Sequence, residues 1–316
     1  MKPYTLIDLH CDTLTDWDYT STGNPDTLND PKRVIALDKL PADCNWAQLF
    51  AIFIPEGKSG QSAIDYFDFY CESFRRQMDK FGDKAAACTN AAEMEAAFSA
   101  GKTAAFLTVE NGAVLAGNPE RIDTVYNAGV RLMTIVWNHE NEIASGHDTD
   151  HGFSDFGREA VRALAKKGIA IDVSHLNDKG FYELLDLHDG TFLASHSNCR
   201  SICSHKRNLT DDMIKHIIER RGVIGLNYYT NFIRDDGNVR SFDDLYAHIL
   251  HFLELGAEDC LALGSDFDGA YLPDCLNTPY KEAALRDELL KKGLGAELTD
   301  KIMYKNAYRF IKDNFR

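Results

Sequence analysis

Histidines and carboxylates stand directly after short apolar runs along this sequence. The stretches that carry them are His10-Cys-Asp12, Glu110, Asn138-His-Glu140, Ser174-His175, Ser195-His-Ser197 and Asp266-Phe-Asp268. Imidazole and carboxylate groups are ligands of zinc and related divalent ions, and they also transfer protons during hydrolysis. A random scatter of the 11 histidines would not place them so regularly at the ends of apolar runs. The pattern therefore predicts a metal-dependent hydrolase.

Five of these residues form a candidate ligand set: His10, Asp12, Glu110, His175 and His196. His10 and Asp12 are two residues apart, so on a strand both side chains point to the same side. The set exceeds the four ligands of one tetrahedral zinc ion, which favours two ions. Glu110 is expected to bridge them, because a carboxylate can be shared and an imidazole cannot. Two ions about 3.5–4 Å apart would also hold a bridging hydroxide at neutral pH.

Each of these ligands also has a structural explanation. Asp12 can cap a turn, and Glu110 before Asn111 can be a solvated turn acid. A lone histidine such as His175 or His196 is usually a core residue with satisfied hydrogen bonds. Because all of them follow apolar runs, ligation is the better hypothesis.

Three further acids have predicted roles. Asp266, after the last apolar run, is expected to accept the proton of the metal-activated water. Asp268 is expected to be a turn acid, since a glycine follows it. Asp8 shares the strand parity of His10 but lies a step deeper, which predicts a structural or supporting role for it.

The apolar runs alternate with amphipathic segments. Their continuous apolar character is typical of strands buried on both faces, and they cover 5–14, 46–54, 103–109, 130–137, 169–173, 191–195, 222–227 and 260–265. Helices are predicted over 63–81, 91–100, 119–128, 155–167, 178–187, 211–220, 241–255, 280–292 and 297–314.

This alternation predicts an α/β fold of parallel strands, and eight units favour a (β/α)8 TIM barrel of the metal-dependent hydrolase type with C-terminal helices. One such domain is expected over residues 1–316. An open doubly wound sheet is the alternative, but no glycine-rich phosphate loop follows the first run. In a barrel the ends of parallel strands meet at one face, so the polar residues gather there.

Composition limits the partners. The net charge of −15 argues against nucleic acid and anionic membranes, since no basic patch offsets it. No targeting segment and no membrane-spanning stretch is visible. The eight cysteines contain no CxxC pair, which is typical of reduced thiols, and a cytoplasmic location is expected. A homodimer is compatible with this architecture.

The motifs resemble those of the renal (membrane) dipeptidase family of zinc peptidases, within the amidohydrolase superfamily. The matching stretches are Asp8-Leu-His-Cys-Asp12, Val109-Glu-Asn-Gly112, Asp155-Phe-Gly-Arg-Glu159, Asp172-Val-Ser-His175, Ala194-Ser-His-Ser197, Lys206-Arg-Asn208 and Gly264-Ser-Asp-Phe-Asp-Gly269. They follow the family's order from residue 7 to about residue 310.

The resemblance implies a binuclear zinc site and a substrate-binding set. His10 and Asp12 would bind one ion, His175 and His196 the other, and Glu110 would bridge them. The groups expected to act on the substrate are His139 on the carbonyl oxygen, Arg207 on the terminal carboxylate, Asp266 as proton shuttle, and Tyr229 and Asn306 in the pocket lining. The loop at 140–153, with His147 and His151 unassigned, is this chain's own and leaves the substrate preference open.

The expected activity is a zinc-dependent dipeptidase acting on dipeptides with a free C-terminal carboxylate, of L,L or L,D configuration. One alternative is another binuclear amidohydrolase, such as a lactonase or a deaminase. Glu110 and the Arg207 motif argue against it. The other alternative is a binding protein without catalysis, against which all five ligands and Asp266 are present.

Overall fold

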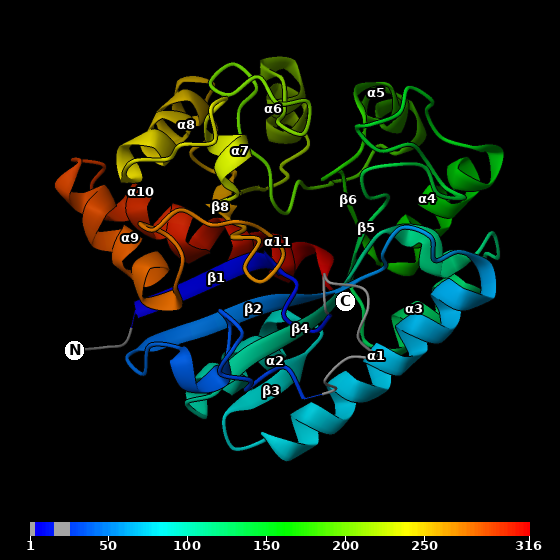
Figure 1. Cartoon of the computed structure of the whole chain (residues 1–316), viewed down its shortest axis with the longest axis horizontal. Coiled ribbons are helices and arrows are strands. Elements are labelled where there is room, and N and C mark those ends of the chain that lie inside the picture. Colours follow the sequence, from blue (N-terminus) through cyan, green and yellow to red (C-terminus); the bar gives the residue numbers. More distant parts are fainter. Residues whose placement is uncertain (1–3, 16–25) are drawn as a thin grey trace.

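The computed structural model describes residues 4–15 and 26–316 and has a parallel β-barrel with helices packed around it (Figure 1). Its strands pair in the order β6-β5-β4-β2-β1-β8-β7. The bounds are β1 Tyr4–Cys11, β2 Cys44–Phe53, β4 Thr103–Glu110, β5 Leu132–Thr134, β6 Ala170–Asp172, β7 Ile224–Leu226 and β8 Leu261–Leu263. Leu193 and Ala194 form parallel bridges to β6 and β7 and close the ring. The predicted (β/α)8 barrel is confirmed.

The helices follow the predicted positions closely. Their bounds are α1 Gly60–Lys80, α2 Ala91–Ser99, α3 Arg121–Asn127, α4 Asp155–Lys167, α5 Asp178–Leu187, α6 Asp211–Glu219, α7 Thr230–Ile233, α8 Phe242–Glu254, α9 Pro279–Lys291, α10 Ala296–Asp300 and α11 Asn306–Asn314. The last predicted helix is interrupted by a π-helical turn over Lys301–Lys305, which separates α10 from α11. Within the described residues, no helix is both long and apolar enough to cross a membrane.

Local chemistry explains both the agreements and the omissions. α4 begins where the Ser154 side chain accepts a hydrogen bond from the Gly157 N–H, and it ends where Gly168 adopts a left-handed conformation with φ 91°. Strand β3, Ala85–Cys88, pairs with β4 but was not predicted, because its alanines carry little β signal. The four residues of α7 are too few to show a helical period.

Apolar side chains pack against both faces of the strands, in an inner and an outer layer. The inner layer fills the barrel with residues such as Leu9, Leu49 and Phe106, and α11 adds Phe310. The outer layer, larger, lies between the strands and the helices. The side-chain amide of Asn306, the first residue of α11, donates to the carbonyl of Leu261 at the start of β8 (2.8 Å). Since α11 thus covers the amino ends of the strands, the carboxyl ends are left for a site.

A register shift in β1 changes the expected facing of Asp8. Asp8 pairs with Gln48, whereas Cys11 pairs with Phe50, so three steps on β1 oppose two on β2, as in a β-bulge. Asp8 lies between Ile7 and Leu9 of the inner layer and bonds the side chain of Gln48 (2.9 Å), so it faces the outer layer. The prediction that Asp8 shares the inward parity of His10 was therefore wrong.

Candidate active site

The carboxyl ends of the strands bring the predicted ligands together around Glu110, the last residue of β4. The Oε1 atom of Glu110 lies 2.9 Å from His175 Nε2 and 3.7 Å from His196 Nε2. Its Oε2 atom lies 3.5 Å from His10 Nε2, which in turn is 3.3 Å from Asp12 Oδ2. Glu110 therefore stands between two pairs of predicted ligands, with one oxygen turned to each pair.

The nitrogen atoms of the three imidazoles are arranged for a cation. His175 Nδ1 is 3.0 Å from Asn138 Oδ1, and His196 Nδ1 is 2.7 Å from Ser195 Oγ, so both Nε2 atoms are left for other partners. These two Nε2 atoms lie only 3.1 Å apart. His10 Nε2 and Asp12 Oδ1 are buried without a hydrogen-bond partner.

The donor atoms gather in two groups, His10 with Glu110 and His196, and His10 with Asp12 and Asp266. Within each group they lie within 4.8 Å of one another. Unpartnered, buried nitrogen and oxygen donors at this spacing fit a metal ion such as zinc.

Burial sets the protonation of the cluster. It lowers the pKa of His175 and of His196 well below the ordinary histidine value, so both are neutral, as ligation requires. Burial raises the pKa of Asp12 to about 6, with repulsion from Glu110 adding to it. Burial acts to lower the pKa of His10, but Asp12 and Glu110 together raise it well above its ordinary value. The carboxylates therefore draw positive charge into the site.

Asp266 stands at the mouth of the barrel beside this cluster. Its Oδ1 atom is 3.9 Å from His10 Nε2, and its Oδ2 atom accepts a hydrogen bond from Asn227 Nδ2 (3.0 Å). Burial raises the pKa of Asp266 to about 7. Asp266 and His175 have positive φ angles of 64° and 71°, a left-handed backbone that is uncommon for non-glycine residues.

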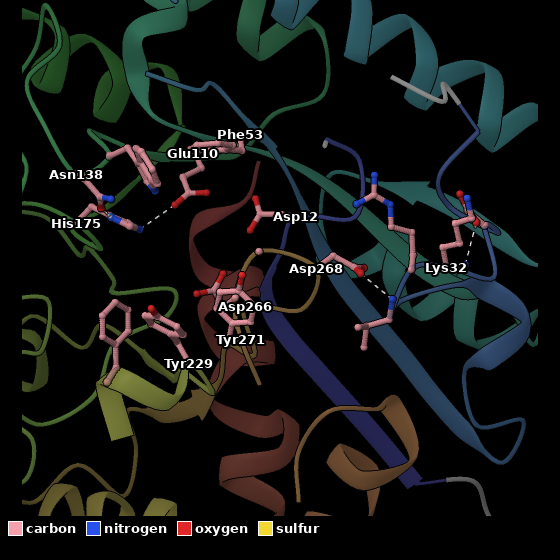
Figure 2. A pocket seen from close by; sticks show the side chains of 17 residues that line it. Asp12, Lys32, Phe53, Glu110, Asn138, His175, Tyr229, Asp266, Asp268 and Tyr271 are labelled. Atoms are coloured by element: carbon pink, nitrogen blue, oxygen red, sulfur yellow. Dashed lines mark hydrogen bonds and ion pairs between the residues drawn. The ribbon is translucent and has the colours of Figure 1, made fainter. Parts of the chain in front are cut away.

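A cavity of about 850 Å³ opens over the cluster. Figure 2 shows Glu110 and His175 on one side of it, Asp12 and Asp266 in the middle, and Lys32 on the far side. Five aromatic residues line it: Phe53, Trp137, Tyr229, Phe232 and Tyr271. The space accommodates a small polar molecule with apolar side chains.

Comparison with known proteins identifies the family to which this site belongs. The family model of the membrane dipeptidases, peptidase family M19, matches residues 1–315. The chain belongs to the membrane dipeptidase family. It is therefore a hydrolase of the metallo-dipeptidase type, as the sequence predicted.

Two relatives illustrate how far the sequence likeness extends. An uncharacterised protein encoded in the 5′ region of pqqA in Klebsiella pneumoniae is 31% identical over 237 residues, which cover 72% of this chain and 88% of that protein. An uncharacterised dipeptidase of Schizosaccharomyces pombe is 32% identical over 151 residues, which cover 46% of this chain and 36% of that protein.

Two solved structures share the fold. One is a dipeptidase designated AC, a metallopeptidase of family M19, with a TM-score of 0.92, 24% identity and 99% coverage of both chains. The other is a metallopeptidase from Rhodobacter sphaeroides liganded with a phosphinate mimic of the dipeptide L-Ala-D-Ala. It has a TM-score of 0.91 and 23% identity over 99% of this chain and 100% of that one.

Among the residues expected to bind substrate, Tyr229 lines this pocket, and Arg207 lies close to the predicted ligands. Arg207 is buried beside His196, donating from Nη2 to the His196 carbonyl (3.0 Å) and from Nη1 to Ser197 Oγ (2.8 Å). Its Nε atom is buried without a partner. Within the described part of the chain, no carboxylate forms a salt bridge with Arg207.

The structure does not bring His139 and Asn306 to the pocket. His139 contacts Glu56, has a 56% exposed side chain, and lines a second cavity of about 490 Å³ that shares Trp137 with the first. Strand β5 already ends at Thr134, so residue 139 lies in the loop beyond the strand rather than at the strand end. Asn306 bonds the start of β8, at the opposite end of the barrel, so its predicted place in the pocket is wrong.

Sequence reasoning missed several residues that line the pocket or lie beside the predicted site residues. Trp137 lines the cavity, and its ring centroid lies 6.2 Å from that of His175. His147, left unassigned, has its ring 5.9 Å from that of His175, and burial lowers its pKa to about 4. Asn138 and Asn227 orient His175 and Asp266. Asn138 directly follows the apolar run 130–137 and Asn227 directly follows strand β7, which was a signal that could have found them.

Proposed function

We propose that this chain is a zinc-dependent dipeptidase for L,L and L,D dipeptides with a free C-terminal carboxylate. The single observation that carries the proposal is the position of Glu110, whose two oxygens face separate ligand pairs. His10 and Asp12 would hold one ion, His175 and His196 the second, and Glu110 would bridge them. When bound, the two ions would supply Lewis acidity and a bridging hydroxide at neutral pH.

Asp266 is proposed as the group that moves the proton. It would accept a proton from the attacking water and return it to the leaving amine nitrogen of the cleaved peptide bond. Its hydrogen bond from Asn227 holds the carboxyl at the mouth of the cluster. A carboxyl group whose pKa lies near the working pH both takes and releases a proton readily, and burial supports this for Asp266.

Arg207 is proposed as the partner of the substrate carboxylate. A guanidinium that is only 4% exposed and has no carboxylate partner among the described residues offers a charge that an incoming carboxylate would satisfy. The carbonyl contact expected of His139 is not supported by its place outside the pocket. We propose that Trp137, close to His175, contacts the substrate on this wall.

The test is an assay of the zinc-loaded protein on L,L and L,D dipeptides, each beside its C-terminal amide, with and without a chelator. We expect the free acids to be cleaved faster than the amides, and the chelator to abolish turnover. Bound metal without cleavage of any dipeptide would move the substrate to another small amide or ester. Cleavage that persists after complete metal removal would refute the metal site.

A further inference from the structure

Asp172 is a buried carboxylate that is linked to the cluster through one serine, Ser195. It ends β6, is fully buried, and is not among the candidate ligands. Its Oδ1 atom accepts the main-chain N–H groups of Ser174 and Ser195, both at 2.9 Å. Its Oδ2 atom accepts the hydroxyls of Thr134 (2.6 Å) and Ser195 (2.5 Å). The two oxygens thus take different kinds of donor, which fixes the orientation of the group.

The Ser195 hydroxyl connects this carboxylate to a candidate ligand. Ser195 Oγ is 2.5 Å from Asp172 Oδ2 and 2.7 Å from His196 Nδ1. A carboxylate only accepts, so the single hydroxyl hydrogen of Ser195 goes to Asp172. The serine oxygen must then accept a hydrogen from His196 Nδ1. Ser174 Oγ, at 3.4 Å, is too distant to compete for the serine hydrogen.

We propose that Asp172 is a positioning residue, which fixes, through Ser195, the one His196 tautomer that can bind metal. With the hydrogen on Nδ1, the Nε2 lone pair faces Glu110 and the second imidazole. The inference deepens the proposed function and rests on it, since it concerns the metal site assigned there. A carboxylate behind a ligating histidine also makes that ligand more basic.

Asp8, on strand β1 of the same barrel, provides a matched comparison. Its Oδ1 atom accepts the main-chain N–H groups of His10 (3.2 Å) and Ser265 (2.9 Å). Its Oδ2 atom accepts the side chains of Gln48 (2.9 Å) and Ser265 (2.6 Å). The Ser265 hydroxyl otherwise meets the His10 carbonyl (3.2 Å) and accepts a hydrogen bond from the Phe267 main-chain N–H (3.1 Å). Asp8 therefore has the same four-donor arrangement without a link to an imidazole ring.

The hydrogen bonds that connect Asp172, Ser195 and His196 form a relay. The substitution Asp172→Asn reverses the direction of these hydrogen bonds. Two N–H groups hold the remaining oxygen in place, so the new amide nitrogen must face Ser195 and donate to it. The Ser195 hydroxyl then turns to donate to His196 Nδ1, which moves the imidazole hydrogen to Nε2, the ligand atom. Ser195→Ala removes the relay without reversing it, and should therefore do less harm.

The experiment compares Asp172→Asn, Ser195→Ala and Asp8→Asn with the wild type in two measurements. Zinc affinity is measured by competition with a chromophoric chelator. The His196 tautomer is read from 15N-1H couplings of the metal-free protein, which depend on neither zinc nor activity. In Asp172→Asn we expect the affinity for one of the two zinc ions to fall about 10- to 100-fold and the imidazole hydrogen of His196 to lie on Nε2. In Ser195→Ala the zinc affinity should fall less, and in Asp8→Asn the His196 ring should keep its hydrogen on Nδ1.

The outcomes separate this inference from the proposed function. A wild type that binds no zinc refutes the proposed function, while the tautomers still test the relay. An unchanged tautomer in Asp172→Asn, or equal zinc loss in Asp172→Asn and Asp8→Asn, overturns the inference. If circular dichroism shows Asp172→Asn to be unfolded, Ser195→Ala decides alone. An unchanged zinc affinity and an unchanged His196 tautomer in Ser195→Ala would overturn the inference. A loss of affinity confined to one of the two zinc ions would support it.

Discussion

At the residue scale, the candidate site contains several buried charged groups that are not balanced by nearby groups of opposite charge. Glu110, Asp12 and Asp266 are carboxyl groups gathered around the single imidazole of His10. Asp12 and Glu110 raise the pKa of His10 well above the ordinary value against the effect of burial. Arg207 is likewise buried without an anionic partner among the described residues. Uncompensated buried charges are costly, so both regions are best explained as binding sites, one for cations and one for a carboxylate.

Asp266→Asn is expected to lower kcat for dipeptide hydrolysis about 10²- to 10⁴-fold, the usual loss when a general acid–base group is removed. The proposed ligands would remain in place, since Asp266 is not one of them. The zinc content should therefore stay at the wild-type value. Steady-state kinetics and metal analysis of the same preparation check this. An active variant would exclude Asp266 from proton transfer, and a variant lacking zinc would make it a ligand instead.

Arg207→Met should remove the preference for a free carboxylate. A hydrogen bond to a charged group contributes about 1.5–3 kcal/mol, so kcat/KM for the free acid should fall about 10- to 100-fold. The C-terminal amide of the same dipeptide serves as the matched control, since it offers no charge for Arg207 to bind. Equal losses on acid and amide would mean that Arg207 supports the structure around His196 rather than the substrate.

At the element scale, the sequence predicted the elements that show a repeating hydrophobic pattern and missed irregularities that occur at a single position. Helices α4 and α5 were predicted with their observed bounds, because Ser154 and Asn177 cap clear amphipathic periods. The bulge of β1 adds one residue at an unmarked position, so simple alternation placed Asp8 on the wrong side. His139 failed for a similar reason, since apolar residues continue to Trp137 although β5 ends at Thr134.

Close contact between strands makes Gly225 of β7 a sensitive position. A Cβ atom there would lie 1.9 Å from the carbonyl oxygen of Ser195, so the backbone beside His196 would have to move. We expect Gly225→Ala to lower the free energy of unfolding by about 1–3 kcal/mol and to weaken zinc binding. Gly82→Ala, whose Cβ would meet Met78 O at 3.2 Å away from the site, is the control. Urea denaturation of both variants should separate them, and equal stabilities would contradict the argument.

At the scale of the whole molecule, the barrel separates stability from function along its axis. α11 and its aromatic residues cover the amino ends of the strands, where Asn306 bonds β8. The polar cluster occupies the carboxyl ends under the 850 Å³ cavity. Catalytic groups of (β/α)8 enzymes lie at that carboxyl face. The family resemblance predicted the ligand set and placed Asn306 in the pocket. In the structure Asn306 follows a π-helical turn and bonds the start of β8, at the opposite end of the barrel.

The protonation of this cluster makes metal binding by the whole protein depend on pH. In the metal-free fold, His10 keeps its proton across the neutral range, because its pKa is raised well above the ordinary value. Asp12 becomes protonated only below about pH 6. A metal ion must displace both protons, so zinc affinity should rise with pH. We expect zinc binding at His10 and Asp12 to release about one proton at neutral pH and about two protons below pH 6.

Zinc titrations between about pH 5.5 and 7.5, in buffers of different ionisation enthalpy, would measure this release. The logarithm of the apparent Kd should fall by about one unit per pH unit near neutrality, and by about two below pH 6. His139→Ala should give the same slopes, because His139 lies outside the cluster and contacts Glu56. A Kd that does not change with pH would mean that zinc binds elsewhere on the protein. Slopes that differ in His139→Ala would return that histidine to the site.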